Sequence, residues 1–483
     1  DDRDREDAVA VTGAGRGVGR ADLELDGVHG VVLRVASQTA GAVSAPAGAS
    51  AMIETDGSQA ILNSGGGTLA ISLTGGDTAT TGRAEWSGPN GTGTQMCATC
   101  STQNNATLKA GGTQTFGSAA HPVTSIVLQG GNNGVGNEAA IDAGGNQTLS
   151  VSGNVALAGG ASGGAFIPGF GLDGMLDNGS SITANGTQTL NIGGNLSLSG
   201  AAAGAPSSTV TGAYITAPVQ RIAVGGDLTM SGGASTAPSY VEPTSGVKIA
   251  SAVLLGNLTA ADLQIGAGGT FTMTPGSGDG GSVLLGAING GAGNAISVQA
   301  ADISIGKTGM PSIAGIGSLD GSTANVTLRA TGGKTALLDR TRIAAGGGTV
   351  TLEITGRGTG LEQTGDSFMY GSDLLLSSNP LVHLNGQSVF TGNVAISSAD
   401  NVIVGSGSGH PARLNAGGNL SIDAGGDVQV INEGGNAAEV TANGTMTINL
   451  VGTGPNKLIV SADSSAGGFA RIWSGGNQSI DFK

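Results

Sequence analysis

The chain has 483 residues, of which 92 are glycine, 3% are aromatic and 11% are charged, and its formal net charge is −15. Large apolar side chains are too scarce for the thick cores of ordinary globular domains, and the acidic balance argues against a surface that holds nucleic-acid phosphates. Small and β-branched residues can still bury a narrow core when they stack along one axis. The composition therefore favours a solenoid.

The chain opens on a charged arm, residues 1–7, which leads into the short apolar run Ala8, Val9, Ala10 and Val11. We expect residues 1–11 to form an N-terminal arm and candidate donor strand, followed by a single continuous β-solenoid over residues 12–483. The first residue is Asp1 and not Met, which suggests a processed, secreted protein. No run of about 18 apolar residues occurs, so the sequence predicts no transmembrane helix.

Residues 7–20, DAVAVTGAGRGVGR, resemble the strand and glycine-rich turn with which short-chain dehydrogenases hold a dinucleotide pyrophosphate. The context differs from that family. The residues that follow alternate like a strand, and none of the three tyrosines has the family's catalytic lysine four positions later. We interpret the segment as turns at the start of the first coil and predict no cofactor.

The two cysteines, Cys97 and Cys100, have a spacing that suits half a metal site, a redox pair or a tight disulfide loop. The four histidines are too scattered to complete a zinc site, and the βαβ pattern that surrounds a thioredoxin-like pair is missing. We expect a loop disulfide in an oxidising compartment, with two free thiols as the alternative.

A short phrase recurs along the chain: a Gly-Gly or Asn-Gly pair, then a polar or apolar residue, then alternating apolar and hydroxyl residues. Glycine and asparagine tolerate the backbone of a tight turn, and the alternation is typical of a strand with one buried face. We interpret the Asn-x-Ser/Thr triplets inside the phrase as stacking asparagines rather than glycosylation sites. The phrase occupies residues 111–116, 144–149, 185–190, 193–198, 225–230, 268–273, 347–352, 417–422, 443–448 and 475–480.

Turn-and-strand phrases at this density predict an all-β, right-handed parallel β-helix, that is, a β-solenoid. At roughly 20 to 25 residues per coil the chain would make roughly 20 coils. The phrases are unevenly spaced, so the loops between coils must be irregular. A sandwich or propeller would need more aromatic residues and a bulkier core.

Carbohydrate-cleaving β-helices need clustered carboxylates or a basic residue on one face of a groove. Most aspartates here follow Gly-Gly, where they are better explained as turn formers. A single Ser-Gly-Asp-Gly-Gly fragment at residues 277–281 is too little for a calcium-binding repeat. The sequence predicts no metal and no enzyme; the residues that a carbohydrate site would use are Asp262, Asp302, Asp339, Arg340 and Arg342.

An uncapped solenoid end exposes unpaired backbone that recruits another strand. The chain closes in strand pattern on Ser479, Ile480, Asp481 and Phe482, and no cap is visible. We expect head-to-tail stacking, in which residues 8–11 of one copy pair with the last coil of its neighbour.

From residue 111 onward the phrases are similar to those of filamentous-haemagglutinin-like passengers exported by two-partner secretion in Gram-negative bacteria. The resemblance implies a β-helix that acts as a surface adhesin or fibre. We therefore expect a non-enzymatic, secreted structural protein at the cell surface or in the matrix, a filament subunit whose main partner is itself. Alternatives are a monomeric adhesin stalk that contacts cell-surface glycans or matrix, and a polysaccharide-binding or polysaccharide-cleaving enzyme.

Overall fold

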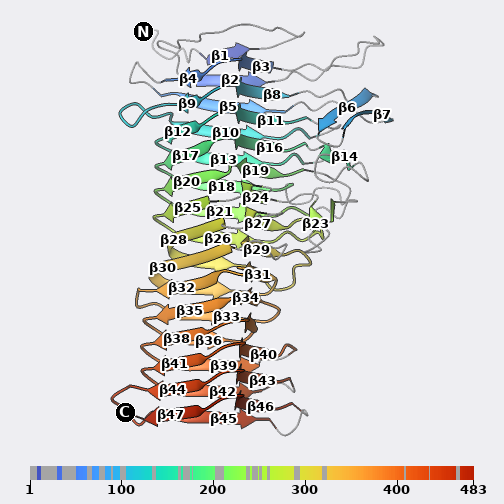
Figure 1. Cartoon of the computed structure of the whole chain (residues 1–483). Coiled ribbons are helices and arrows are strands. Elements are labelled where there is room, and N and C mark those ends of the chain that lie inside the picture. The colour runs from blue at the N-terminus through green and yellow to red at the C-terminus, as the bar shows by residue number, and fades with distance from the viewer. Residues whose placement is uncertain are drawn as a thin grey trace. The chain divides into compact units, whose positions relative to one another are not determined.

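The computed structural model describes residues 8–11, 30–34, 51–62, 68–75, 82–88, 91–97, 105–132, 137–161, 165–166, 175–176, 178–201, 211–234, 240–241, 248–249, 253–257, 262–287, 294–317, 324–406, 409–433, 436–463 and 468–482. The elements in these residues are β-strands, from β1 (Ala8–Val11) to β47 (Gln478–Phe482), and no helix occurs among them (Figure 1). The expectation of an all-β protein is confirmed for the described residues.

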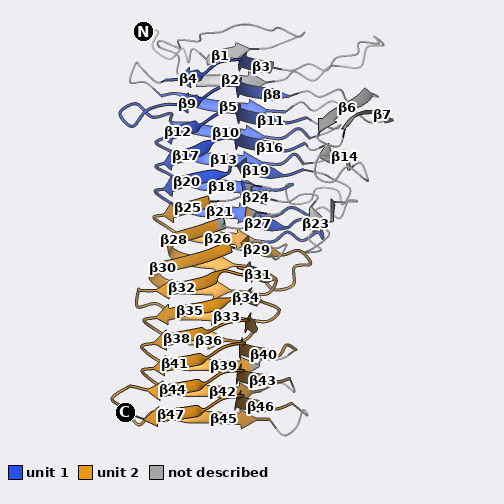
Figure 2. Ribbon diagram, in the orientation of Figure 1, with its two compact units in different colours: residues 1–257, 275–284 blue, residues 258–274, 285–483 orange. Residues whose placement is uncertain are grey.

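The chain divides into two compact units (Figure 2). Unit 1 contains residues 1–257 and 275–284, and unit 2 contains residues 258–274 and 285–483. β27 (Val283–Ala287) contains one of the boundaries. One continuous solenoid over residues 12–483 stays a prediction, and the units are described one at a time.

In unit 1 the chain passes repeatedly through three strand positions, and strands at the same position in successive coils pair in parallel. The first stack consists of β3 (Ala51–Thr55), β8 (Ala106–Ala110), β11 (Ala139–Ala143), β16 (Ser180–Ala184), β19 (Ala213–Thr216) and β24 (Val253–Asn257). The second stack consists of β4 (Gln59–Ile61), β9 (Gln114–Phe116), β12 (Gln147–Val151), β17 (Thr187–Ile192) and β20 (Val219–Val224). The third stack consists of β1, β2 (Gly30–Arg34), β5 (Ala70–Thr74), β10 (Ser125–Gln129), β13 (Val155–Ala158), β18 (Leu196–Ser199) and β21 (Leu228–Ser231).

Three short antiparallel pairs in unit 1 stand apart from these stacks. They are β6 (Gly82–Gly88) with β7 (Gly91–Cys97), β14 (Ala165–Phe166) with β15 (Met175–Leu176), and β22 (Tyr240–Val241) with β23 (Lys248–Ile249). Each pair falls within a connection between coils.

Unit 2 repeats the same plan. Its first stack consists of β29 (Ala314–Gly317), β31 (Thr341–Ala344), β34 (Phe368–Gly371), β37 (Gln387–Phe390), β40 (Ala412–Ala416), β43 (Ala438–Ala442) and β46 (Ala470–Ser474). The second stack consists of β25 (Asp262–Ala267), β28 (Asn294–Ile305), β30 (Ala324–Leu337), β32 (Thr349–Ile354), β35 (Asp373–Ser378), β38 (Val394–Ser398), β41 (Leu420–Ala424), β44 (Met446–Leu450) and β47. The third stack consists of β26 (Phe271–Thr274), the later halves of β28 and β30, β33 (Gly360–Gln363), β36 (Val382–Leu384), β39 (Val402–Ser406), β42 (Val428–Asn432) and β45 (Leu458–Ala462).

Long parallel stacks of this kind fit a β-solenoid, and their register gives the number of residues between neighbouring coils. Hydrogen-bonded partners on neighbouring coils of unit 1 are 32, 33, 41 and 55 residues apart. In unit 2, from β30 onward, such partners are between 20 and 32 residues apart. The unit 1 offsets exceed the 20 to 25 residues that the sequence suggested, because long connections follow the third strand of each coil.

The core of each unit is a set of side-chain rows that run from coil to coil. In the first stack of unit 1, Leu108, Ile141, Ile182 and Ile215 are register partners, and each is 0% exposed. Alternate residues of the same strands point outward. Each such buried aliphatic side chain contributes about 1.5–3 kcal/mol relative to an exposed one, so many small rows replace one thick core.

The glycine-rich corners let the coils approach closely enough to share hydrogen bonds. The amide of Gly144 donates to the carbonyl of Ala110 at 2.8 Å, and the amide of Gly145 donates to the carbonyl of Gly112 at 2.9 Å. A Cβ on Gly144 would fall on the carbonyl oxygen of Gly111. The corner therefore needs glycine because neighbouring backbones leave no room for a side chain.

A row of buried glutamines runs through the second stack of unit 1. Gln114 donates from Nε2 to Oε1 of Gln59, Gln147 to Gln114, Gln188 to Gln147, and Gln220 to Gln188, at 2.7–2.8 Å. The amide nitrogens of Gln114, Gln188 and Gln220 also donate to carbonyls of the first stack. The row thereby pairs polar groups of residues that are at most 1% exposed, from Gln114 to Gln220.

Asparagines at the corners link one coil to the next by side-chain to backbone bonds. Oδ1 of Asn154 accepts the amide of Asn195, and Oδ1 of Asn195 accepts the amide of Asp227, at 2.8 and 2.9 Å. In unit 2, Oδ1 of Asn419 accepts the amide of Thr445 at 2.9 Å. These contacts explain why Asn or Asp so often follows the glycine pair.

Gly144→Ala should destabilise unit 1, because the new methyl group collides with the backbone of the preceding coil. We expect a loss of roughly 1–3 kcal/mol, seen as a lower urea midpoint by circular dichroism. Gly266→Ala is the matched control, because a Cβ at Gly266 of β25 has no atom within 4 Å. Equal midpoints for the two variants would contradict the role given to the corner.

Gln147→Leu should leave Oε1 of Gln114 without its donor and Nε2 of Gln188 without its acceptor inside the core. Each buried, unpaired group costs about 1–3 kcal/mol, so the urea midpoint should fall clearly. Thr148→Val, at the neighbouring outward position of β12, should change stability by only about 0.5 kcal/mol. A Gln147→Leu protein as stable as the parent would show that the glutamine row adds nothing.

Candidate functional site

The coil made by β45, β46 and β47 exposes side chains at core positions. Ile480, Phe482 and Val460 are 40%, 60% and 49% exposed. Their register partners one coil earlier, Ile448, Leu450 and Val430, are each 0% exposed. The difference arises because no described strand covers β45 or β47 on the edge away from β42 and β44.

The same coil has aromatic side chains outside the core positions. Phe469 is 47% exposed and Trp473 is 46% exposed. Among the described residues the coil therefore combines open backbone edges with a cluster of exposed apolar groups. Such a combination is typical of a surface that another strand or chain covers.

The residues expected to meet at a head-to-tail joint lie in different stacks. Ala8–Val11 form β1 of the third stack, paired with β2, and their side chains lie outside the described part of the structure. Ser479, Ile480, Asp481 and Phe482 lie in β47 of the second stack and are all exposed. In the last coil of unit 2, the third stack ends on β45.

Cys97 is the last residue of β7, opposite Gly82 of β6. Its side chain and the whole of Cys100 lie outside the described residues, and so do residues 12–20 of the dinucleotide-like segment. The loop disulfide and the turn interpretation of residues 12–20 therefore stay predictions.

Three of the five residues named for a carbohydrate site gather around Asp366. Arg340 and Arg342 each approach a carboxylate oxygen of Asp366 at 3.2 Å, and Oδ1 of Asp339 accepts the amide of Asp366 at 2.9 Å. Arg340 adopts φ 66°, a left-handed backbone that is uncommon outside glycine. The sequence did not single out Asp366, which holds the group together.

The two remaining candidates lie elsewhere in unit 2. Asp302 lies in β28, and its Oδ1 accepts the amide of Lys334 at 3.1 Å. Asp262 begins β25. Asp302 therefore links two coils, as the corner asparagines do.

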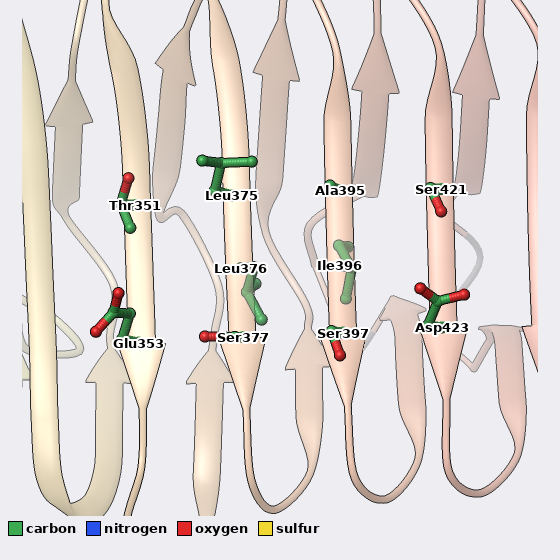
Figure 3. A pocket seen from close by; sticks show the side chains of 10 residues that line it. All are labelled: Thr351, Glu353, Leu375, Leu376, Ser377, Ala395, Ile396, Ser397, Ser421 and Asp423. Carbon is green, nitrogen blue, oxygen red and sulfur yellow. The ribbon is translucent and has the colours of Figure 1, made fainter. Parts of the chain in front are cut away.

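A shallow depression lies on the outer face of the second stack of unit 2, over β32, β35, β38 and β41. Figure 3 shows Glu353 and Asp423 on the outermost of these strands, with Ser377 and Ser397 between them. Leu375 in the depression is 51% exposed. The small serines create the hollow, and its charged lining groups are carboxylates only.

Buried titratable groups are few in the described residues and do not form a catalytic pair. Burial raises the pKa of Asp142, opposed by the Thr183 hydroxyl, which donates to it at 2.6 Å, and by the charge of Lys109. A hydrogen bond from Lys109 to Glu54, 2.7 Å long, raises the pKa of that lysine. Burial lowers the pKa of His383 below 6.5, against the attraction of Glu362 and Glu433.

The described residues contain no group of three or more His, Cys, Asp or Glu side chains placed to hold a metal ion. In the part of the chain that the structure describes, no helix has the length and apolarity needed to span a bilayer. Comparisons with protein-family models, with curated proteins and with solved structures found no match.

His383 should make unit 2 less stable as the solution becomes acidic. Because its pKa is lower in the folded protein, the unfolded chain binds the proton first, and stability falls as the pH drops below 6.5. His383→Gln should therefore flatten the pH dependence of the unfolding free energy between about pH 7 and 5. Direct NMR titration of His383 provides the check, and a pKa at or above 6.5 would refute this explanation.

Proposed function

We propose that this chain is a non-enzymatic, extracellular structural protein, the subunit of a filament whose copies stack head to tail. The observation that carries the proposal is the terminal coil of β45, β46 and β47. Its apolar core positions are open, while the equivalent positions one coil earlier are fully buried. A second copy of this chain is the occupant that this surface fits best.

A further parallel coil satisfies both needs of the terminal coil at once. It pairs with the free edges of three strands, and it places aliphatic side chains over Ile480, Phe482 and Val460. A copy of this chain carries suitable strands and rows, because its own coils already stack in this way. A heterologous contact of this type repeats without closing and gives a filament.

The stacks suggest which strand meets which. β1 belongs to the third stack, and a joint that continues each stack would pair it with β45. Ser479, Ile480, Asp481 and Phe482 of β47 would then be covered by the neighbour's second-stack position. The joint therefore involves the whole coil and not one strand pair.

The haemagglutinin-like phrases support an extracellular role at a bacterial surface or in its matrix. In the same proposal the coils wind right-handedly. The offsets of 32 to 55 residues in unit 1 favour fewer than the roughly 20 coils expected at first. A monomeric adhesin stalk and a carbohydrate-cleaving enzyme are the competing functions.

Negative-stain electron microscopy and light scattering of the 483-residue protein test the proposal. We expect filaments much longer than one molecule. Removal of residues 1–11 and, separately, the double change Ile480→Asp and Phe482→Asp should leave single folded particles, because charge and lost pairing oppose the joint.

Leu375→Asp is the matched control, because Leu375 is 51% exposed on a lateral face. It should leave filaments intact. Single particles of the parent protein at all concentrations would overturn the filament in favour of a stalk or an enzyme. Filaments unaffected by both terminal changes would overturn the proposed joint.

A further inference from the structure

The outer face of the first stack of unit 2, over β31, β34, β37, β40, β43 and β46, differs in chemistry from the rest of the chain. We call it the arginine–aromatic face. One row of register partners along it reads Arg342, Phe368, Gln387, Arg413, Glu439 and Arg471. A second row beside it includes Tyr370, Asn415 and Trp473.

At one end of this face two arginines share one carboxylate. Nε of Arg413 lies 3.3 Å from Oε2 of Glu439, and Nη2 of Arg471 lies 2.9 Å from Oε1. The Glu439 side chain is 12% exposed, whereas those of Arg413 and Arg471 are 48% and 51% exposed. Glu439 thus fixes two guanidinium groups and leaves a net positive charge at the surface.

The other end repeats this arrangement with different residues. Arg340 and Arg342 share Asp366, and Asp339 turns its Oδ1 to the amide of Asp366. The carboxylate of Asp366 is 33% exposed and Arg340 is 41% exposed. Ion pairs at such exposure contribute little to stability, so their main effect is to orient the guanidinium groups.

Aromatic rings accompany both arginine pairs. Phe368 and Tyr370 lie with ring centroids 5.5 Å apart, next to Arg342 in register. The Arg471 guanidinium lies 5.6 Å from the centre of the Phe469 ring. In a chain that is only 3% aromatic, this gathering on one face needs an explanation.

We infer that the arginine–aromatic face binds a linear acidic polysaccharide laid along the stack. Its outward strand positions carry three arginines and one glutamate, a net charge of +2, in a chain of net charge −15. The guanidinium groups recognise carboxylate or sulfate, the rings pack on the apolar faces of sugars, and Gln387 and Asn415 offer amides to hydroxyl groups.

The spacing of the rows favours a polymer of small repeating units over a folded protein partner. Neighbouring coils lie about 4.8 Å apart, close to the length of one sugar in an extended chain. The face presents its groups in straight rows and has no deep apolar pocket of the kind that anchors protein interfaces. The depression over β32 to β41, lined by Glu353 and Asp423, has the opposite charge and should repel the same ligand.

Affinity electrophoresis of the full chain in gels that contain polygalacturonate, dextran sulfate, neutral dextran or poly-glutamate tests the inference. We expect retardation by polygalacturonate, dextran sulfate or both, weakened by salt, and none by neutral dextran. The double change Arg413→Gln and Arg471→Gln should weaken binding about tenfold, and Tyr370→Ala should also weaken it.

Arg329→Gln is the matched control, because Arg329 is an exposed arginine paired with a glutamate, Glu353, on the second stack. It should bind as the parent does. Circular dichroism confirms that each variant is folded. Retardation by one acidic polysaccharide alone would identify carboxylate or sulfate as the recognised group.

Three results would overturn the inference: no retardation by either acidic polysaccharide, an equal loss in the Arg329→Gln control, or retardation by poly-glutamate as strong as by the polysaccharides. The last would assign the face to an acidic polypeptide. Because every residue of the face lies in unit 2, the outcome does not depend on head-to-tail assembly.

Discussion

The close approach of backbone to backbone at the glycine corners is the constraint on which each unit depends. Corner amides donate across the gap to the preceding coil, and a Cβ at Gly144 has no room there. Once the corners are fixed, residues at the same position of successive coils fall opposite one another. Rows of like side chains then build a core from small residues.

Polar rows decide the register that the apolar rows alone would leave loosely defined. Slipping a coil by one residue would break the buried glutamine row of unit 1 and the asparagine bonds at its corners. Unit 2 uses Val, Leu or Met at the position that Gln occupies in unit 1, as at Val350, Leu420 and Met446. Its corners keep the asparagine bonds, so register there is set mainly at the turns.

The sequence predicted strand type, turns and parallel stacking, because the repeated phrase contains both the glycine pair and the alternation. It could not predict coil length, because connections of varying size separate the phrases. It named Arg340 and Arg342 but missed Asp366 and the face to which Arg342 belongs. Arg342, Arg413 and Arg471 are far apart in sequence, and only the register aligns them. The glutamine row did have a signal, a Gln at the fourth position of several phrases.

Hydrogen exchange of the corner amides tests the central claim most directly. If coils rest on one another through their corners, the amides of Gly144, Gly145, Gly193 and Gly225 should exchange as slowly as those of the strands beside them, since each donates to the preceding coil. Exchange at the rate of an unstructured loop would show that the corners are open, and the stacked-coil account would be wrong.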